Sequence, residues 1–266
     1  MRNLLITISL IFLSGIKLFS QDITDKPPHN WAKFVHIETG WVYPNGTIKE
    51  SIAVRQNISS YYVNQYSTGY VSATTTGFTM GARLEYFYTK FKVGISTGLK
   101  YTSYNSEISG YTSSNADFFY LRYSILNSDT KFARVKALTE ENKFISIPLE
   151  FRYIPFKYKG VSLFVKGGVE FSIFNLKKNT DIKFQDNAME VNQDLILSNI
   201  SEPSNKFQSN LYGTIGLSFG QEDKVNYMFE VFLPSPFLTK NNFTLTEVDA
   251  FDGFKLSVKV PIRNRN

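Results

Sequence analysis

Residues 77–101 read GFTMGARLEYFYTKFKVGISTGLKY, and this stretch decides the fold class. Up to Tyr86, apolar side chains occupy every second position and alternate with small, polar or charged ones. The same alternation resumes after Thr89-Lys90. A period of two is typical of β-strands that present one apolar and one polar face. The stretch therefore predicts two antiparallel strands joined by a two-residue turn.

Period-two alternation recurs along the rest of the chain and predicts eight strands in all. Short connections of roughly two to seven residues alternate with connections of roughly thirty to forty, and the last connection is of intermediate length. Transmembrane β-barrels have this asymmetry, because their periplasmic turns are short and their outer loops are long. We therefore predict an all-β fold, an eight-stranded antiparallel up-and-down transmembrane β-barrel with long extracellular loops. The expected strands lie near residues 34–43, 76–88, 91–101, 145–153, 161–173, 211–219, 225–233 and 254–262.

Two of the short connections predict a register. The two-residue turn after Tyr88 places Arg83 opposite Ser96, so that polar-face residues meet. A turn centred on Tyr158 sets Glu150 directly opposite Lys166, as a cross-strand ion pair. Neither hairpin needs a bulge to keep its two faces separate.

We expect the apolar face of the strands to point outward and the polar face to fill the lumen. Aromatic residues gather near the strand ends, as the interfacial girdles of a membrane barrel require. The polar face carries charges of both signs, which must pair inside a narrow lumen because an unpaired buried charge costs several kcal/mol. The opposite orientation would give a soluble, lipocalin-like carrier. The predicted interior network comprises Glu38, Arg83, Glu85, Lys100, Glu150, Arg152, Lys166, Glu170, Glu230 and Lys255.

The N-terminus has the pattern of a secretory signal peptide over residues 1–20. An apolar run over Leu4–Ile16 follows Arg2, and the expected cleavage site lies after Ser20. The run is shorter than the ~20 apolar residues that a transmembrane helix needs. The expected divisions are then a periplasmic segment over 21–33, an outer-membrane barrel over 34–262 and a tail over 263–266.

Composition excludes several classes of function. The chain has no Cys, so it has neither a disulfide framework nor a lipidated cysteine. Its formal charge of +6 is spread without a basic block, which argues against a nucleic-acid partner. Only two histidines are present: we expect His29 to lie in a solvated segment and His36 to be a polar residue of the lumen. No catalytic, cofactor-binding or metal-binding residue is predicted.

One strand carries a family resemblance. Residues 144–156 read FISIPLEFRYIPF, with Ile147-Pro148-Leu149 followed by Arg152-Tyr153 before a short turn. This pattern resembles the PorT-like outer-membrane β-barrel family, and the stretches KVGISTGLKY, LFVKGGVEF and GFKLSVKVPI are similar to the same family. The resemblance implies a small outer-membrane barrel with periplasmic termini. Some members of that family serve the type IX secretion machinery.

These features together predict a non-enzymatic outer-membrane protein. It would be a membrane-anchored scaffold or binding module, in contact with outer-membrane lipid and with a protein partner through its long loops or periplasmic rim. A secretion-accessory role follows from the resemblance alone. Three alternatives stay open: a lipid-modifying enzyme that pairs His36 with a hydroxyl group, a narrow channel, and the soluble lipocalin-like carrier.

Overall fold

The computed structural model describes residues 31–49, 52, 54–55, 71–110, 118–124, 130–186, 193–200, 205–221, 224–240 and 243–262. The expected signal peptide, its cleavage site, His29 and the tail over 263–266 lie outside these residues. Large parts of the long loops, such as 56–70 and 111–117, also lie outside them. Among the described residues, no helix has the length and apolarity needed to cross a membrane.

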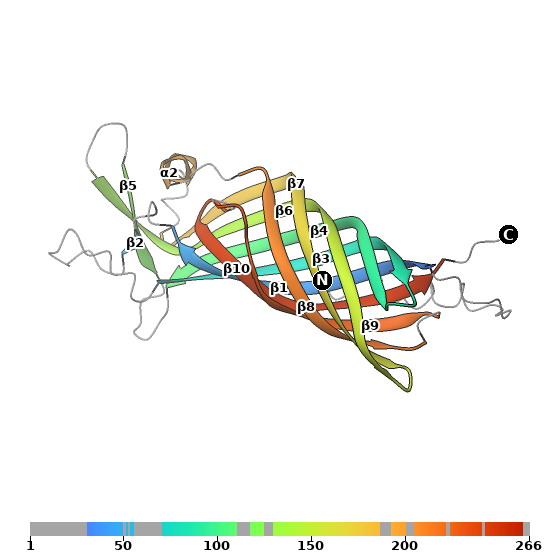
Figure 1. Cartoon of the computed structure of the whole chain (residues 1–266). Helices are drawn as coiled ribbons and strands as arrows, with labels where there is room; N and C mark the ends of the chain where they lie inside the picture. Colours follow the sequence, from blue (N-terminus) through green and yellow to red (C-terminus); the bar gives the residue numbers. More distant parts are fainter. Residues whose placement is uncertain are drawn as a thin grey trace, which may run out of the picture. The chain divides into compact units, whose positions relative to one another are not determined.

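Eight strands form a closed antiparallel ring in the order β6-β4-β3-β1-β10-β9-β8-β7, with β7 pairing back to β6. Each strand of the ring neighbours the preceding and following one in the ring's chain order, so the predicted up-and-down barrel is confirmed (Figure 1). The ring consists of β1 (Trp31–Ile48), β3 (Val71–Tyr88), β4 (Val93–Gly110), β6 (Thr130–Tyr158), β7 (Val161–Phe184), β8 (Gln208–Phe219), β9 (Asn226–Pro236) and β10 (Thr246–Pro261).

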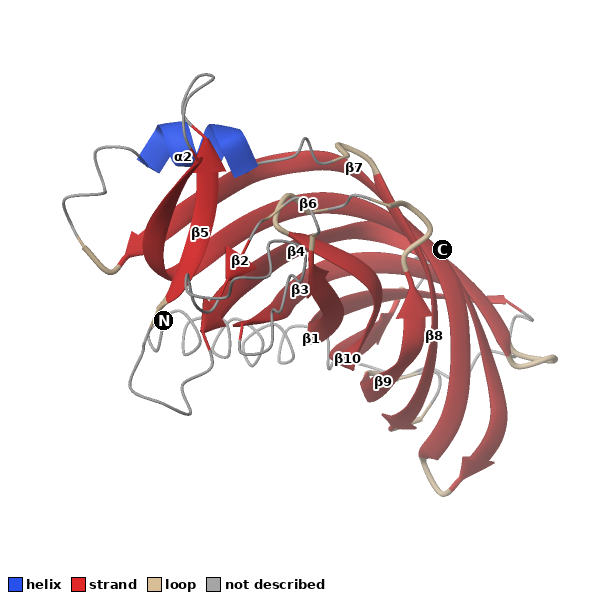
Figure 2. Ribbon diagram, turned by 90° about the vertical axis from the view of Figure 1, so that its left-hand side faces the viewer, coloured by secondary structure: helices blue, strands red, loops and turns tan. Residues whose placement is uncertain are grey.

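The strands run well past the ranges that periodicity predicts. The β3–β4 ladder continues to Val71 and Gly110, and β6 has 29 residues. Figure 2 shows the long course of β6 beside β7. In these extensions the outward positions become polar, as at Thr74 and Glu107, so the apolar alternation fades while the strand pairing persists. We call the end that carries the extensions the cap end, and the end with the short hairpin turns the turn end.

The first register prediction is wrong by two residues. Tyr88 pairs with Val93, so residues 89–92 form a four-residue turn, and Arg83 faces Gly98 instead of Ser96. Lys92 adopts a positive φ of 56°, which closes the longer turn. Because the shift is even, each side chain keeps the face that the sequence predicts.

The second register prediction is also wrong. The β6–β7 turn lies at Lys159 and Gly160, whose φ values of 43° and 83° are those of a type I′ hairpin turn. A register shift between Tyr153 and Phe156 then places Gly168, not Lys166, opposite Glu150. The hairpin therefore does contain a bulge, contrary to the expectation. Bulges of this kind increase the local twist of a strand pair.

The orientation of the two faces is the one expected. Outward positions form an apolar belt around the ring, with Ile37 47%, Leu84 50% and Leu99 61% exposed. Toward the cap end of the belt, the Trp41 ring lies 5.4 Å from that of Phe254. The inward positions carry the charged residues, so the apolar interior of a lipocalin-like carrier is excluded.

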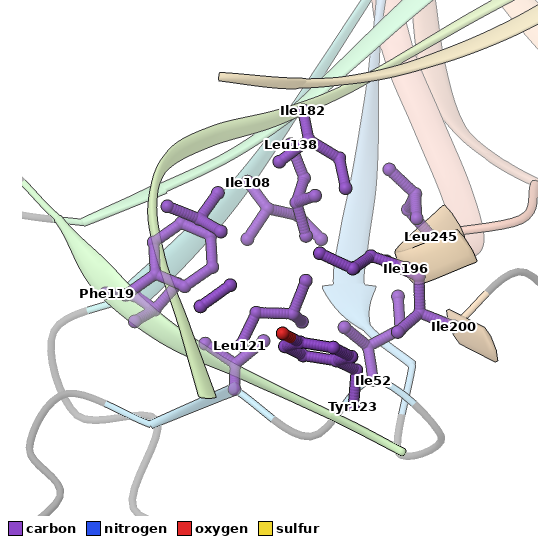
Figure 3. Packing of buried hydrophobic residues seen from close by; sticks show 14 of the residues in the cluster. Ile52, Ile108, Phe119, Leu121, Tyr123, Leu138, Ile182, Ile196, Ile200 and Leu245 are labelled. Carbon is purple, nitrogen blue, oxygen red and sulfur yellow. The ribbon is translucent and has the colours of Figure 1, made fainter. Parts of the chain in front are cut away.

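A second layer of structure covers the cap end. It includes β2 (Val54–Arg55), β5 (Phe119–Ser124) and the helix α2 (Gln193–Ile200), which the sequence did not predict. β2 pairs with β5 and β5 with the first residues of β6, while Ile196 and Ile200 of α2 pack into the same apolar cluster (Figure 3). We call these elements, together with the outer ends of β6 and β7, the cap. Its cluster contains Ile52, Val54, Val71, Ile108, Phe119, Leu121, Tyr123, Ala133, Val135, Leu138, Ile182, Phe184, Ile196, Ile200 and Leu245.

Candidate functional site

The lumen of the barrel holds a network of charged side chains. Inward positions on seven of the eight ring strands contribute to it, and no member is more than 8% exposed. The structure brings together all ten residues that the sequence singles out: Glu38 of β1, Arg83 and Glu85 of β3, Lys100 of β4, Glu150 and Arg152 of β6, Lys166 and Glu170 of β7, Glu230 of β9 and Lys255 of β10.

Three cations and three carboxylates meet at the centre of the lumen. The Nη2 atom of Arg83 lies 2.6 Å from Glu38 Oε2, and its Nη1 atom contacts Glu150. Lys255 Nζ lies 3.2 Å from Glu38 Oε2 and 3.5 Å from Glu150 Oε1. The two cations therefore bridge the same two carboxylates across the lumen. The central cluster comprises Arg83, Lys166, Lys255, Glu38, Glu150 and Glu230.

Lys166 and Glu230 complete the central cluster and are joined to it by ion pairs and hydrogen bonds. Lys166 donates to both carboxylate oxygens of Glu230, at 2.8 and 2.9 Å, and lies 3.6 Å from Glu150 Oε2. Thr214 Oγ1 donates to Glu230 at 3.1 Å, and Tyr212 Oη donates to Glu150 at 2.6 Å. Buried charges are tolerated when they are paired and hydrogen-bonded. Every charge of the central cluster is paired, whereas the Nε atom of Arg83 has no hydrogen-bond partner within the described part of the chain.

Two smaller groups flank the central cluster. Toward the turn end, Arg152 makes a bidentate bond to Glu85, with Nε at 2.7 Å and Nη2 at 3.0 Å. The Nε2 atom of His36 lies 2.7 Å from the same carboxylate. Toward the cap end, Lys100 contacts Glu170. The ten residues thus combine five cationic with five anionic side chains.

Apolar layers lie on both sides of the charged network. On the turn side, the Arg152 guanidinium sits 4.8 Å from the centre of the Phe87 ring, so the charged and apolar layers touch. The turn-side layer consists of Phe34, Phe87, Ile154, Phe164 and Met228. The cap-side layer consists of Val42, Tyr104, Phe144, Tyr212, Phe232, Phe243, Val248 and Phe251. Beyond it lies the apolar cluster of the cap, so that side chains fill the lumen along its length.

The sequence analysis missed Glu140, a buried carboxylate on the cap side. It accepts hydrogen bonds from the backbone N–H of Thr244, at 2.7 and 3.0 Å, and of Leu245, at 2.8 Å. Asn142 Nδ2 donates to it at 2.7 Å. These bonds hold the segment before β10 inside the cap end of the barrel. Extending the even-numbered inward parity of β6 back from Ser146 would have identified Glu140 as inward-facing.

His36 lies inside the lumen and not at the surface of the barrel. The residue is 1% exposed, and its Nε2 atom is engaged by the Glu85 carboxylate. Within the described part of the chain its Nδ1 atom has no hydrogen-bond partner, so no hydroxyl group is bonded to it there. A nucleophile and its base must lie within hydrogen-bond reach of each other. Among these same residues, no group of three or more acidic or histidine side chains could hold a metal ion.

The outer wall of the barrel is hollowed beside the β8–β9 pairing. A groove of about 820 Å³ lies over β6, β7, β8 and β9, where Gly167 and Gly213 face each other and leave the wall bare of side chains. Beside it the β8–β9 pairing is interrupted next to Pro234, which has no N–H to donate. Tyr212 and Glu150 also line it. The groove is apolar apart from this hydrogen-bonded pair.

No family model matches the sequence, and no curated protein matches it, so the PorT-like resemblance of residues 144–156 stays a prediction. Solved structures that resemble the chain include the outer membrane protein OprG from Pseudomonas aeruginosa, at 13% identity and a TM-score of 0.42, covering 88% of this chain and 99% of that one. Outer Membrane Protein W from E. coli matches at 11% identity and a TM-score of 0.34, over 88% and 100%. The translocator domain of autotransporter NalP from Neisseria meningitidis matches at 9% and 0.29, over 96% and 97%. At these identities and TM-scores the three structures assign neither a family nor a function.

Proposed function

We propose that this chain is an exported outer-membrane protein that acts as a membrane-anchored binding module and not as a channel or an enzyme. The apolar belt would face lipid, the turn end would face the periplasm and the cap would stand outside the cell. Two features support this orientation: the outward exposure of large apolar side chains and the alternation of short turns with long connections.

The filled lumen is the observation that carries the proposal. An eight-stranded barrel is just wide enough for its own side chains. Here five cations and five carboxylates occupy that space, with an apolar layer on either side of them. An ion would have to displace paired charges and pass both layers. The barrel is therefore better suited to anchor the cap than to conduct.

A bilayer experiment tests this proposal directly. Full-length protein expressed with its leader is fractionated, and the outer-membrane fraction is run unboiled and boiled to detect a folded barrel by its altered gel mobility. The same purified protein is then reconstituted in planar bilayers. We expect outer-membrane location, heat-modifiable mobility and no discrete conductance. Discrete conductance steps would overturn the anchor in favour of a channel, and a soluble protein would overturn the membrane assignment.

The enzyme alternative is disfavoured by the surroundings of His36. A lipid-modifying enzyme would need this histidine beside a hydroxyl group at the membrane surface, whereas its Nε2 atom is bound to Glu85 inside the lumen. Incubating the reconstituted protein with labelled phospholipid and with lipopolysaccharide tests the alternative. Acyl transfer or release that is lost on His36→Ala would overturn the non-enzymatic assignment.

A secretion-accessory role is the narrower form of the proposal. Its support is the resemblance of the Ile147-Pro148-Leu149 strand and its neighbours to PorT-like barrels. Deleting the gene and measuring protein export by the type IX route tests it. Unchanged export would remove this role and leave the anchored binding module in place.

A further inference from the structure

One face of the cap carries cations interleaved with aromatic rings. On β5, Phe119, Leu121 and Tyr123 point into the cap cluster, so Tyr120 and Arg122 point away from it. On β6 and β7 the same alternation turns the side chains between the buried ones outward. We call this surface the cap face. It comprises Phe118, Tyr120, Arg122, Phe132, Arg134, Lys136 and Lys183.

The register places these residues side by side. Tyr120 lies opposite Arg134, and Arg122 lies opposite Phe132, so that a ring and a cation meet in each cross-strand pair. Directly opposed side chains in an antiparallel pair have Cβ atoms about 4.5–5.5 Å apart. Lys136 follows Arg134 on the same face of β6. The cations thus form a compact group and are not scattered over the cap.

The cations of the cap face lack the partners that the lumen provides. Among the described residues, none of Arg122, Arg134, Lys136 and Lys183 forms an ion pair. Asp181, the outward carboxylate nearest Lys183 along β7, accepts a 2.7 Å hydrogen bond from a side chain of α2. Within the lumen, by contrast, the ten charged residues of the network pair with one another. Within the described part of the chain, these four cations are therefore left without a carboxylate partner.

The aromatic rings of this face are held in place. Phe118 and Tyr120 meet edge to face, with ring centroids 5.5 Å apart and planes at 89°. The Arg134 guanidinium lies 5.6 Å from the Phe118 ring, within the range of a cation–π interaction. Phe118 and Tyr120 are half-buried while Arg134 is exposed. The surface therefore offers packed aromatic rings beside exposed positive charges.

This combination favours a hydrated anionic polymer over the other classes of partner. The centre of a protein interface is usually built on large apolar anchors and is poor in Lys. No large hydrophobic residue of the cap face is among the exposed ones of the described chain. Lipid is also a less suitable partner, because β7 runs seven residues from the exposed apolar Leu176 to Lys183, or roughly 23 Å along the strand at 3.3 Å per residue. Sugar rings can stack their C–H faces on aromatic side chains while their carboxylates meet Arg and Lys.

We propose that the cap face binds a carboxylate-bearing polysaccharide that reaches the protein from outside the membrane. Arg134, Lys136, Arg122 and Lys183 would contact its carboxylates, and Tyr120 would stack on a sugar ring. The proposal deepens the anchored binding module and rests on it for the outward placement of the cap. The binding itself depends only on the folded cap face.

Binding to defined polymers tests the proposal on the full-length chain in detergent micelles. Polygalacturonate serves as the acidic polysaccharide, dextran as the neutral one and polyglutamate as an acidic peptide. We expect polygalacturonate to bind in a salt-sensitive manner and dextran not to bind. The double variant R134Q/K136Q should weaken polygalacturonate binding about 2- to 30-fold, because each exposed ion pair contributes modestly. The variant Tyr120→Ser should weaken polygalacturonate but not polyglutamate binding.

A matched control removes the same charge from the other end of the barrel. Lys90 and Lys157 lie at the turn end, and K90Q/K157Q should leave binding unchanged. Heat-modifiable gel mobility shows whether each variant is folded. Equal binding by wild type and R134Q/K136Q overturns the proposal. If polyglutamate binds as well as polygalacturonate and Tyr120→Ser has no effect, the polysaccharide is overturned as the partner class. Vesicles containing lipopolysaccharide serve as a further probe, and binding to these vesicles alone overturns a source outside the membrane. Fractionation reports separately on membrane location, so failure of the anchor and failure of this site are distinguishable.

Discussion

Removing the Arg83 cation from the central cluster should destabilise the barrel strongly. The Arg83→Met variant keeps a long side chain but leaves three carboxylates facing only Lys166 and Lys255. Arg83 is 1% exposed and contacts Glu38 at 2.6 Å as well as Glu150. Breaking a buried ion pair by removing one partner costs about 3–5 kcal/mol, because the remaining charge stays buried and uncompensated. We expect a loss of this size in the free energy of unfolding.

Restoring the charge balance should recover part of that loss. In the double variant R83M/E38Q, two cations face two carboxylates again, so its destabilisation should be smaller than that of Arg83→Met alone. The assay is urea unfolding of protein folded into lipid vesicles, followed by tryptophan fluorescence from Trp31 and Trp41. Arg122→Met removes a cation from the cap face and serves as the matched control, with an expected change within about 0.5 kcal/mol.

Two results would refute this reasoning. A loss below about 1 kcal/mol for Arg83→Met would mean that water reaches the cluster and screens its charges. A double variant as unstable as the sum of its two single variants would mean that Arg83 and Glu38 act independently. Either outcome would also weaken the filled lumen as the basis for the anchor function.

Three further perturbations test other parts of the structure. An added Cβ at Gly81 would lie 2.7 Å from the backbone oxygen of Leu99, whereas at Gly167 it would meet no atom within 4 Å. Gly81→Ala should therefore lower the free energy of unfolding in urea by about 1–3 kcal/mol, and Gly167→Ala should leave it almost unchanged. Equal losses in the two variants would contradict the close strand contact at Gly81. Leu99→Arg should cost about 2–4 kcal/mol in vesicles if the residue lies near the bilayer centre; an unchanged free energy of unfolding would contradict a lipid-facing belt. Glu140→Ala removes the acceptor for the backbone N–H of Thr244. Amide hydrogen exchange should therefore become faster in the segment before β10, while the strands of the belt stay protected. Exchange in that segment as slow as in the wild type would show that the carboxylate is dispensable.

The closed lumen gives a physical reason for separating anchoring from binding in this protein. Charged and apolar layers fill the ring, so substitutions there should act on folding and insertion. The cap, by contrast, has its own apolar cluster around Phe119 and Ile196. The side chains on its outer surface do not belong to that cluster. Changes on the cap face can therefore alter binding with little effect on the barrel.

Local alternation in the sequence was enough to predict the barrel and the face of its side chains. Strand geometry sends neighbouring residues to opposite sides, so parity alone indicated that Glu38, Arg83 and Glu150 share an interior. Parity could not predict which charges meet, because Arg83 reaches Glu38 on a neighbouring strand and Glu150 two strands away around the ring. Those distances depend on the stagger of the strands and on how the ring closes.

The turns and the cap needed the tertiary structure for a different reason. Lys92 and Lys159 adopt positive φ angles in the turns, and lysine does not predict this conformation. Both predicted registers were therefore wrong, each by two residues, and because this shift is even each side chain kept its predicted face. In the cap, β5 and α2 belong to different connections of the barrel, yet their apolar side chains meet in one cluster over the outer ends of β6 and β7. The short apolar stretch around Leu121 carries no signal of that partner. The sequence by itself determined the ring and its inner face, and the folded chain decided the charge pairing, the registers and the cap, because these arise only when separate strands meet.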